Sequence, residues 1–407
     1  MQKAPKSIAL IREGKLPPDR RVALSPDQCV RFQETFPNCR LMVQSSPIRC
    51  FSDAEYAGKG IEVVEQVDEA EVLIGVKEVP IDQLIPSKTY LFFSHTFKKQ
   101  PYNRGLLRAM LEKNIRLIDY ELLSAEKGGR LLGFGRYAGV VGAYNGLLGW
   151  GKMTGDFQLK PAHQCFDRKE VDEQLSKVEL PEGFKLVVTG TGRVSSGIQE
   201  LLLAAGLHRV DAKDFLMSEF PEPVFTVLSP LDYVRRMDGR SFLLSEFFKD
   251  PAGFESSFLP FAQTAHVYMS GHYWKEGSPV FFTPEQASAE EFSLRLIADI
   301  SCDIAGPIPS TLRPSTISDP FYGYQASSAK EVAFGSPGSI GVMAVDNLPG
   351  ELPRDASEDF GDDLLAQVLP QFFNADPGTV LQRATQTDSG QLTPSFHYLK
   401  DYVDEAD

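Results

Sequence analysis

The segment from residue 184 to residue 205 constrains the fold of this chain more than any other part of the sequence. An apolar run over 184–188 predicts a buried strand, and the pattern over 194–205 predicts a helix. Two glycines, Gly190 and Gly192, lie between them. A strand, a glycine-rich turn and a helix in this order are typical of a parallel β–α unit whose loop holds the diphosphate of a dinucleotide.

The two glycines have separate physical roles in such a loop. Gly190 permits the tight turn, and Gly192 lets backbone N–H groups approach a diphosphate at the start of the helix. Ser195 stands where the third glycine of the Gly-x-Gly-x-x-Gly pattern is expected, and Gly197 follows two residues later. A glycine-rich turn without function is the alternative interpretation.

An acidic residue ends the next predicted strand, over 208–212. Asp211 lies 21 residues after Gly190, close to the ~20 expected for the acid that binds a ribose 2′-hydroxyl. A carboxylate at that place repels a 2′-phosphate, which favours NAD over NADP. The alternative is that Asp211 only caps the following turn.

Strand-like and helical runs alternate along the rest of the chain, and two of the strands are predicted over 8–11 and 266–269. The runs over 71–76 and 89–93 are almost wholly apolar, which is typical of strands buried on both faces in a parallel sheet. The pattern over 104–113 predicts an amphipathic helix, and Ser25 and Gln28 predict a capping box at the start of another. This alternation indicates an α/β fold.

Two polar residues follow the apolar strands directly. Lys77 and His95 each lie at a predicted carboxyl end, where open α/β sheets bind their ligands. Taken singly, such a lysine is usually a solvated surface residue and such a histidine is usually structural. Arg21 and Arg130 are candidate carboxylate clamps, with surface salt bridges as the alternative.

A glycine-rich apolar stretch over 138–151 predicts a helix. It carries Gly139, Gly142, Gly146 and Gly149. Glycine inside a helix costs ~0.5–1 kcal/mol relative to alanine, so a close-packing reason is expected. We interpret it as a helix that passes tightly between two domains, with an ordinary core helix as the alternative.

Composition narrows the class of protein. The chain has 407 residues, 42% hydrophobic, which excludes a disordered chain and predicts two or three domains. Its 41 basic against 55 acidic residues disfavour nucleic acid and anionic membranes as partners. The five cysteines show no Cys-x-x-Cys spacing, so neither a metal site nor a disulfide framework is expected. With no apparent secretory signal, we expect a reduced, cytoplasmic protein.

The chain resembles the saccharopine dehydrogenase (lysine-forming) and lysine–2-oxoglutarate reductase family, whose relatives are alanine dehydrogenase and the NAD-binding domain of transhydrogenase. The resemblance is collinear and covers nearly the whole chain. The glycine loop and residues 233–274 most resemble the reductase members of the family. The matching segments are 20–26, 74–80, 94–98, 117–121, 133–139, 189–195, 298–303 and 344–349.

The resemblance implies two Rossmann-like domains with a cleft between them, the first of them discontinuous. We expect a substrate and catalytic domain over 1–135 and 346–407, and a dinucleotide-binding domain over 136–345. No second catalytic domain is expected. Lys77 and His95 would be the acid–base pair, tuned by Glu78 and Glu121, and Asp303 would face the nicotinamide. The expected substrate-binding residues are Arg21, Arg130, Lys98 and Phe134, and the expected cofactor-binding residues are Gly190, Gly192, Arg193, Val194, Asp211, Asp299 and Asn347.

The implied reaction is saccharopine + NAD(P)⁺ + water ⇌ L-lysine + 2-oxoglutarate + NAD(P)H. We expect NAD as the cofactor, with NADP possible because the reductase-type members often use it. The partners would be a small amino acid and a 2-oxo acid, in a monomer or a homodimer. The stretch over 304–309 departs from the Gly-Gly-Ser-type stretch of the family, which leaves the substrate open. The alternatives are reductive amination of a small oxo acid, as in alanine dehydrogenase, and a non-catalytic nucleotide-binding protein of the same fold.

Overall fold

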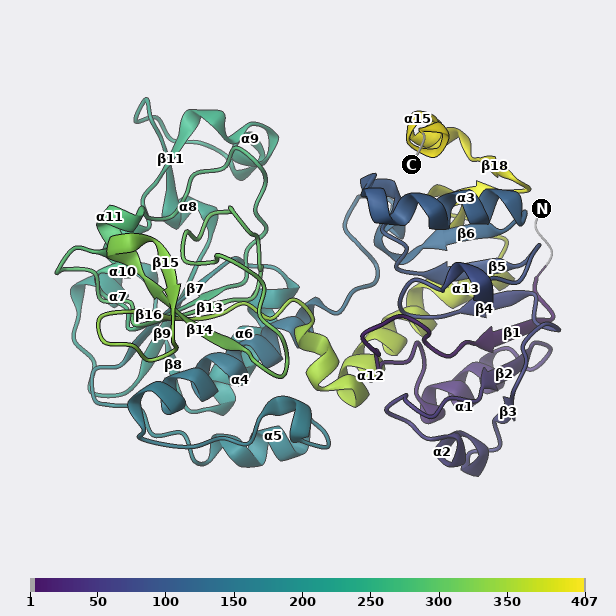
Figure 1. Ribbon diagram of the computed structural model, residues 1–407, viewed down its shortest axis with the longest axis horizontal. Helices are drawn as coiled ribbons and strands as arrows, with labels where there is room; N and C mark the ends of the chain where they lie inside the picture. The colour runs from purple at the N-terminus through teal and green to yellow at the C-terminus, as the bar shows by residue number, and fades with distance from the viewer. Residues whose placement is uncertain (1–3, 406–407) are drawn as a thin grey trace. The chain divides into compact units, whose positions relative to one another are not determined.

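The computed structural model describes residues 4–405 and divides the chain into two compact units (Figure 1). Unit 1 comprises residues 1–134 and 353–407, and unit 2 comprises residues 135–352. The boundaries expected from the sequence were 135/136 and 345/346. Residues 348–351 stay with unit 2 because Asn145 donates a 2.7 Å hydrogen bond to the buried Glu351.

Unit 1 contains a sheet in which six consecutive strands are parallel and follow the order β3-β2-β1-β4-β5-β6, with β3 at one edge. This is the 3-2-1-4-5-6 order of the doubly wound Rossmann fold. Two antiparallel strands, β17 and β18, extend the sheet beyond β6. The strands are β1 (Ser7–Leu10), β2 (Arg40–Gln44), β3 (Glu62–Val64), β4 (Val72–Ile74), β5 (Thr89–Phe92), β6 (Arg116–Asp119), β17 (Thr385–Asp388) and β18 (Gln391–Leu392).

The helices of unit 1 come from both ends of the chain. The predicted capping box is confirmed at α1, where Ser25 and Gln28 exchange hydrogen bonds. Gln28 also donates to the carbonyl of Glu358 in α12, which ties the C-terminal segment to the N-terminal one. The helices are α1 (Pro26–Thr35), α2 (Asp53–Gly58), α3 (Arg104–Glu112), α12 (Pro353–Asp363), α13 (Leu369–Phe373), α14 (Val380–Ala384) and α15 (Lys400–Asp404).

Unit 2 contains a second sheet, in which β8-β9-β7-β12-β13-β16 are parallel and β14 and β15 extend the edge in antiparallel fashion. The expectation of two Rossmann-like α/β units is therefore confirmed. The strands are β7 (Lys185–Thr189), β8 (His208–Arg209), β9 (Val224–Leu228), β12 (Val267–Ser270), β13 (Leu296–Asp299), β14 (Phe321–Gln325), β15 (Lys330–Val332) and β16 (Ile340–Met343).

The strand order of this sheet differs from the order that the prediction for Asp211 assumed, in which the strand before Asp211 lies beside the glycine-loop strand. The strand that pairs with β7 on the side away from β12 is β9, and β8 lies beyond it at the edge. Asp211 follows β8, so it belongs to a strand that does not touch the glycine-loop strand.

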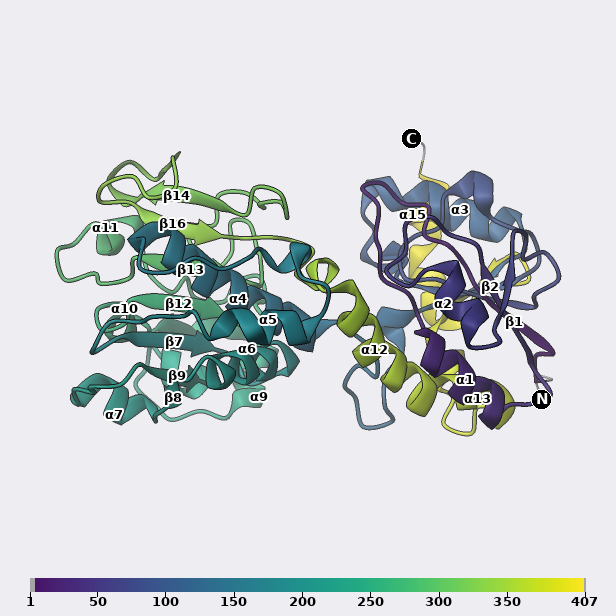
Figure 2. The same cartoon turned by 90° about the horizontal axis from the view of Figure 1, so that it is seen from below.

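The longer helices of unit 2, α4 and α6, run side by side along one face of its sheet (Figures 1 and 2). Shorter helices and a separate antiparallel pair, β10 with β11, fill the connections. The helices are α4 (Gly135–Thr154), α5 (Arg168–Leu175), α6 (Arg193–Ala204), α7 (Ala212–Met217), α8 (Pro230–Tyr233), α9 (Leu244–Lys249), α10 (Leu259–Ala262) and α11 (Pro284–Ala287), and the paired strands are β10 (Val234–Arg236) and β11 (Phe254–Ser256).

The glycines of α4 have the close-packing reason that was expected. They face unit 2 itself. A Cβ on Gly139 would lie 1.9 Å from the carbonyl oxygen of Val194 in α6, and one on Gly146 would lie 2.5 Å from Met269 in β12. The small residues let α4 lie directly against α6 and the sheet.

Of the helices within residues 4–405, none combines the length and the hydropathy that a membrane crossing requires.

Candidate functional site

The carboxyl edge of the unit 1 sheet collects four ionisable side chains. Glu13 follows β1, Lys77 follows β4, His95 follows β5, and Glu121 follows β6. These strands are neighbours and run in parallel, so their carboxyl ends share one edge. Glu13 was not among the residues expected from the sequence, although it follows the predicted strand over 8–11 as Lys77 follows its own.

Lys77 is held in place through its backbone by Glu13. The two oxygens of the Glu13 carboxylate accept the backbone N–H of Val76 at 2.7 Å and that of Lys77 at 2.8 Å. Burial raises the pKa of Glu13 to about 7, against the effect of those two hydrogen bonds. Glu13 is therefore a carboxyl group that can gain or lose a proton near neutral pH.

The Lys77 ammonium itself is disfavoured by its surroundings. Burial, followed by the positive charge of Arg21, lowers the pKa of Lys77. The charge of Asp19 partly opposes this. A lysine in this state releases its proton more readily than a free side chain, which is what a general base requires.

Arg21 is buried and forms a bidentate pair with Asp19. Its Nε lies 3.0 Å from Oδ1 and its Nη2 lies 2.6 Å from Oδ2. The guanidinium also lies over the ring of Phe134, 4.3 Å from its centroid, and this ring stacks on Phe360 at 4.6 Å. Arg21 and Phe134 are thus brought together, as the prediction of a shared substrate-binding role requires.

Glu121 joins three of the predicted site residues. Its carboxylate lies 2.7 Å from Nδ1 of His95, 2.9 Å from Nζ of Lys98 and 2.9 Å from Nη2 of Arg130. Burial would raise its pKa, but hydrogen bonds from His95 and Lys98 and the charges of Lys98 and Arg130 outweigh it and lower the pKa to about 2. Glu121 is therefore a fixed negative charge that orients the imidazole.

The backbone around His95 is organised from β6. The buried carboxylate of Asp119 accepts the backbone N–H groups of Ser94, His95 and Glu121. His95 adopts a left-handed conformation with φ of 55°, which is uncommon for a residue other than glycine. Its position is thus set by contacts from the neighbouring strand.

Glu78, the other predicted tuning carboxylate, faces a different partner. Its Oε2 lies 2.7 Å from Nζ of Lys15, whereas its buried Oε1 has no hydrogen-bond partner within the described part of the chain. Glu78 and Glu121 were both expected to tune the acid–base pair, but Glu78 pairs with Lys15 whereas Glu121 contacts His95.

In unit 2, the glycine loop has the geometry expected of it. Gly190 has a φ of 97°, and a Cβ there would lie 2.3 Å from the carbonyl oxygen of Gly271. Gly192 is exposed at the N-cap of α6, with nothing near its missing Cβ. Arg193 is exposed and Val194 half-buried in the first turn. Gly197 provides the close packing expected of the third glycine of the Gly-x-Gly-x-x-Gly pattern. A Cβ there would lie 1.9 Å from the carbonyl oxygen of Arg136 in α4.

Asp211 caps α7. Its Oδ1 accepts the backbone N–H groups of Lys213 at 3.0 Å and Asp214 at 2.9 Å. This is the alternative that the sequence left open. With β9 between it and the glycine-loop strand, Asp211 lacks the position that the ribose-binding prediction assumed.

The predicted contact of Asp299 with a cofactor does not fit its burial. Its side chain has 0% exposure, and its oxygens accept hydrogen bonds from Ser270, Ser301, the N–H of Cys302 and Thr311. Asp299 is instead a positioning residue for the turn that follows β13. That turn carries Asp303, half-buried, whose pKa is raised to about 6 by burial and by the charge of Asp299.

Two other strand ends complete this edge of unit 2. Asn347, a predicted cofactor contact, is half-buried beyond β16, where it precedes the turn of residues 348–351. His272 follows β12, and its Nδ1 lies 2.8 Å from the hydroxyl of Thr189 beside the glycine loop. Sequence reasoning missed His272, although it follows the predicted strand over 266–269.

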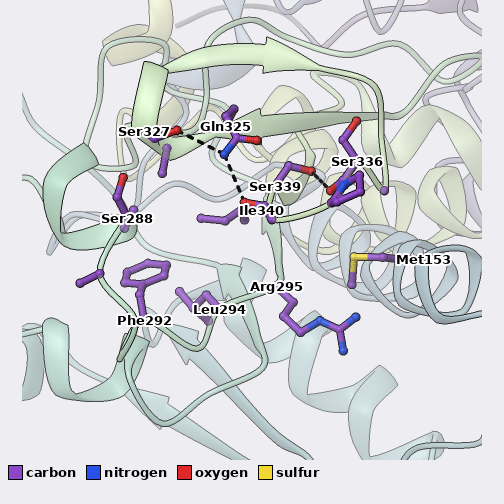
Figure 3. A pocket seen from close by; sticks show the side chains of 16 residues that line it. Met153, Ser288, Phe292, Leu294, Arg295, Gln325, Ser327, Ser336, Ser339 and Ile340 are labelled. Carbon is purple, nitrogen blue, oxygen red and sulfur yellow. Dashed lines mark hydrogen bonds between the residues drawn. The ribbon is translucent and has the colours of Figure 1, made fainter.

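A cavity of about 430 Å³ in unit 2 lies away from these residues (Figure 3). Leu294 and Arg295 precede β13 and Ile340 begins β16, so this cavity opens at the amino ends of the parallel strands. Gln325 hydrogen-bonds to Ser327 on its wall. The glycine loop and Asp303 lie at the opposite, carboxyl ends.

The two doubly wound units and the polar residues at their strand ends define a Rossmann-like α/β protein, and comparison with known proteins agrees. Residues 9–141 match the family model described as "Alanine dehydrogenase/PNT, N-terminal domain". A solved L-alanine dehydrogenase shares the fold, with a TM-score of 0.66 at 16% identity over 98% of this chain and 99% of that one.

More specific relatives carry the resemblance stated from the sequence. The mitochondrial alpha-aminoadipic semialdehyde synthase of Mus musculus is 30% identical over 97% of this chain, which spans 47% of that protein. The NAD(+), L-lysine-forming saccharopine dehydrogenase of Yarrowia lipolytica is 25% identical over 94% of this chain and 96% of its own length. The expected resemblance to the saccharopine dehydrogenase family is therefore confirmed.

Proposed function

We propose that this chain catalyses saccharopine + NAD(P)⁺ + water ⇌ L-lysine + 2-oxoglutarate + NAD(P)H + H⁺. The observation that supports this most strongly is the pair of strand-end residues in unit 1. Lys77 has a lowered pKa and His95 is oriented by Glu121, so two separate groups can exchange protons. The Yarrowia lipolytica relative, named for this reaction, covers nearly the same length of chain.

The reaction needs those two groups at different steps. A bound nicotinamide would supply the acceptor for the hydride that leaves the Cα–H of the secondary amine. One base accepts a proton from the amine nitrogen, a role we assign to Lys77 because its pKa is lowered. The other group, His95, removes a proton from the water that adds to the imine. It then returns that proton to nitrogen. As the C–N bond of the carbinolamine breaks and the C=O bond of the oxo acid forms, the hydroxyl proton passes to His95.

Substrate carboxylates would be held by cationic side chains of unit 1. Arg21, Lys98 and Arg130 are the candidates, with Phe134 packing against the aliphatic part of the substrate. Arginine suits this role because its planar fork binds a carboxylate through two hydrogen bonds. The dinucleotide would be held in unit 2 by the loop of Gly190 and Gly192 and the first turn of α6.

One observation favours a second candidate, reductive amination of a small oxo acid. Arg21 already forms a bidentate pair with Asp19, and a site that keeps this pair has fewer cations for a doubly acidic oxo acid. A substrate with a single carboxylate then fits better. The fold similarity to an L-alanine dehydrogenase is compatible with this alternative.

The deciding experiment measures NADH and NADPH oxidation by the whole chain. The amine and oxo-acid pairs are lysine with 2-oxoglutarate, and ammonia with pyruvate. Turnover with the first pair alone supports the proposal, and turnover with the second alone supports the alternative. No turnover with any pair, together with intact dinucleotide binding, would indicate a non-catalytic nucleotide-binding protein. Lys77→Met is the matched inactive control.

Two further expectations stay predictions. The five cysteines are all free, as a reduced compartment such as the cytoplasm would keep them. A monomer or a homodimer is the expected state, which size-exclusion chromatography with light scattering would measure.

A further inference from the structure

The order of strands in unit 2 changes which residue lies beside the glycine loop. In a parallel nucleotide-binding sheet, the adenosine ribose is contacted from the carboxyl end of the strand next to the glycine-loop strand. In this protein the neighbour of β7 is β9. The contact is direct at the loop itself, where the N–H of Gly190 donates a 2.8 Å hydrogen bond to the carbonyl of Leu228, the last residue of β9.

An acidic residue follows β9 within one turn. Ser229 comes directly after Leu228, and Asp232 accepts hydrogen bonds from its N–H at 2.7 Å and from its hydroxyl at 2.8 Å. Both bonds end on Oδ2 of Asp232. Within residues 4–405, no hydrogen bond or ion pair of the protein reaches Oδ1, and the side chain is exposed. One carboxylate oxygen is therefore fixed and the other is available to a ligand.

Asp211 is less well placed for the same role. Adjacent strands of a sheet are ~4.8 Å apart, so β8 lies on the order of 10 Å from β7, twice the separation of β9. Both bonds that cap α7 end on Oδ1 of Asp211, so the strand order, rather than the use of its carboxylate, distinguishes Asp211 from Asp232.

The nearby arginines are paired with acids. Arg235 lies 2.8 Å from Glu255, and Arg236 lies 2.8 Å from Asp238. Their positive charge is thus compensated locally by Glu255 and Asp238.

Given the proposed dinucleotide-dependent function, on which this inference rests, we propose that Asp232 is the specificity residue of the nucleotide site. Its Oδ1 accepts a hydrogen bond from the 2′-hydroxyl of the adenosine ribose. The same negative charge repels a 2′-phosphate, so the protein selects NAD(H) over NADP(H).

The test is a fluorescence titration of the full chain with NADH, NADPH and the NADH analogue that lacks the adenosine 2′-hydroxyl. The variants are Asp232→Asn, which keeps an oxygen for the bonds from Ser229, and Asp211→Asn as the matched control. We expect wild type to bind NADH at least tenfold more tightly than NADPH. Asp232→Asn should reduce that ratio about tenfold, whereas Asp211→Asn should leave it unchanged. With the deoxy analogue, wild type and Asp232→Asn should bind within twofold of each other.

The possible failures are distinguishable. If wild type binds neither dinucleotide, the proposed function fails. If wild type binds but Asp232→Asn keeps the wild-type ratio, or if wild type prefers NADPH, the assignment of Asp232 is overturned while the proposed function stands. If Asp211→Asn loses the preference for NADH over NADPH and Asp232→Asn keeps it, Asp211 is the specificity residue instead.

Discussion

Nδ1 of His95 lies 2.7 Å from the carboxylate of Glu121, and the two residues end neighbouring parallel strands, β5 and β6. The carboxylate also faces Lys98 and Arg130, and it stays ionised because their charges and hydrogen bonds outweigh its burial. An ionised partner fixes the imidazole and leaves Nε2 to act on a substrate. The relationship joins four of the predicted site residues in one network.

Lys77→Met tests the proposed base. Loss of a general acid–base group typically reduces kcat by ~10²–10⁴, and we expect that range here with dinucleotide affinity nearly unchanged. In the oxidative direction, wild-type kcat/KM should rise with pH through a group that titrates below the ~10.4 of free lysine, because the pKa of Lys77 is lowered. Near wild-type turnover with an unaltered pH profile would contradict the assignment.

His95→Gln tests the second group. The variant should lower kcat by ~10²–10⁴, the usual effect of losing a general acid–base group, and its loss should combine with that of Lys77→Met less than additively if both belong to one proton network. Dinucleotide titration of each variant checks the fold. Strict additivity of the two losses would indicate independent roles.

Glu121→Gln tests the network through stability. The folded pKa of about 2 is below the ~4.3 of a free glutamate, so Glu121 stabilises the fold above that pH and loses the effect as pH falls towards 2. Because Lys98 and Arg130 are partly exposed, we expect the variant to lose only about 1–2 kcal/mol at pH 7. Urea unfolding at pH 7 and pH 3 measures the difference, which should shrink at pH 3. The exposed Glu126→Gln is the control and should change the free energy of unfolding at pH 7 by less than about 0.5 kcal/mol.

Arg21→Met separates packing from substrate binding. The variant leaves the buried Asp19 without its bidentate partner, which costs about 3–5 kcal/mol of stability. The double variant Asp19→Asn with Arg21→Met should recover most of that stability. If Arg21 binds a substrate carboxylate, KM for the oxo acid stays about ten- to a hundredfold higher in the double variant. A KM that recovers with stability would make Arg21 structural.

Gly197→Ala tests the contact of α4 with α6. A Cβ there would overlap the carbonyl of Arg136, a backbone atom that cannot rotate away. We expect a loss of roughly 2–4 kcal/mol in urea unfolding. Gly58→Ala at the end of α2, where nothing lies within 4 Å, should be neutral or up to about 1 kcal/mol more stable. Equal effects at the two positions would contradict the packing argument.

Local sequence patterns were enough to predict the glycine loop with its flanking elements and part of the candidate site. The strand, glycine turn and helix around Gly190 are contiguous in sequence, so their geometry could be predicted from residue type alone. Lys77 and His95 could be found because a side chain directly after a parallel strand always lies at the carboxyl edge of the sheet. The same rule, applied to the predicted strands over 8–11 and 266–269, would have found Glu13 and His272.

The tertiary structure decided what depends on contacts between distant segments. Spacing along the chain put Asp211 in the ribose-binding position, but hydrogen bonding placed β9 beside β7 and moved β8 to the edge. The glycines of α4 indicated close packing, yet only the fold showed that their partners are α6 and the unit 2 sheet. Likewise, residue type could not give the burial that lowers the pKa of Lys77 and raises that of Glu13. Strand order and burial follow from the total free energy of packing, which no short window of sequence contains.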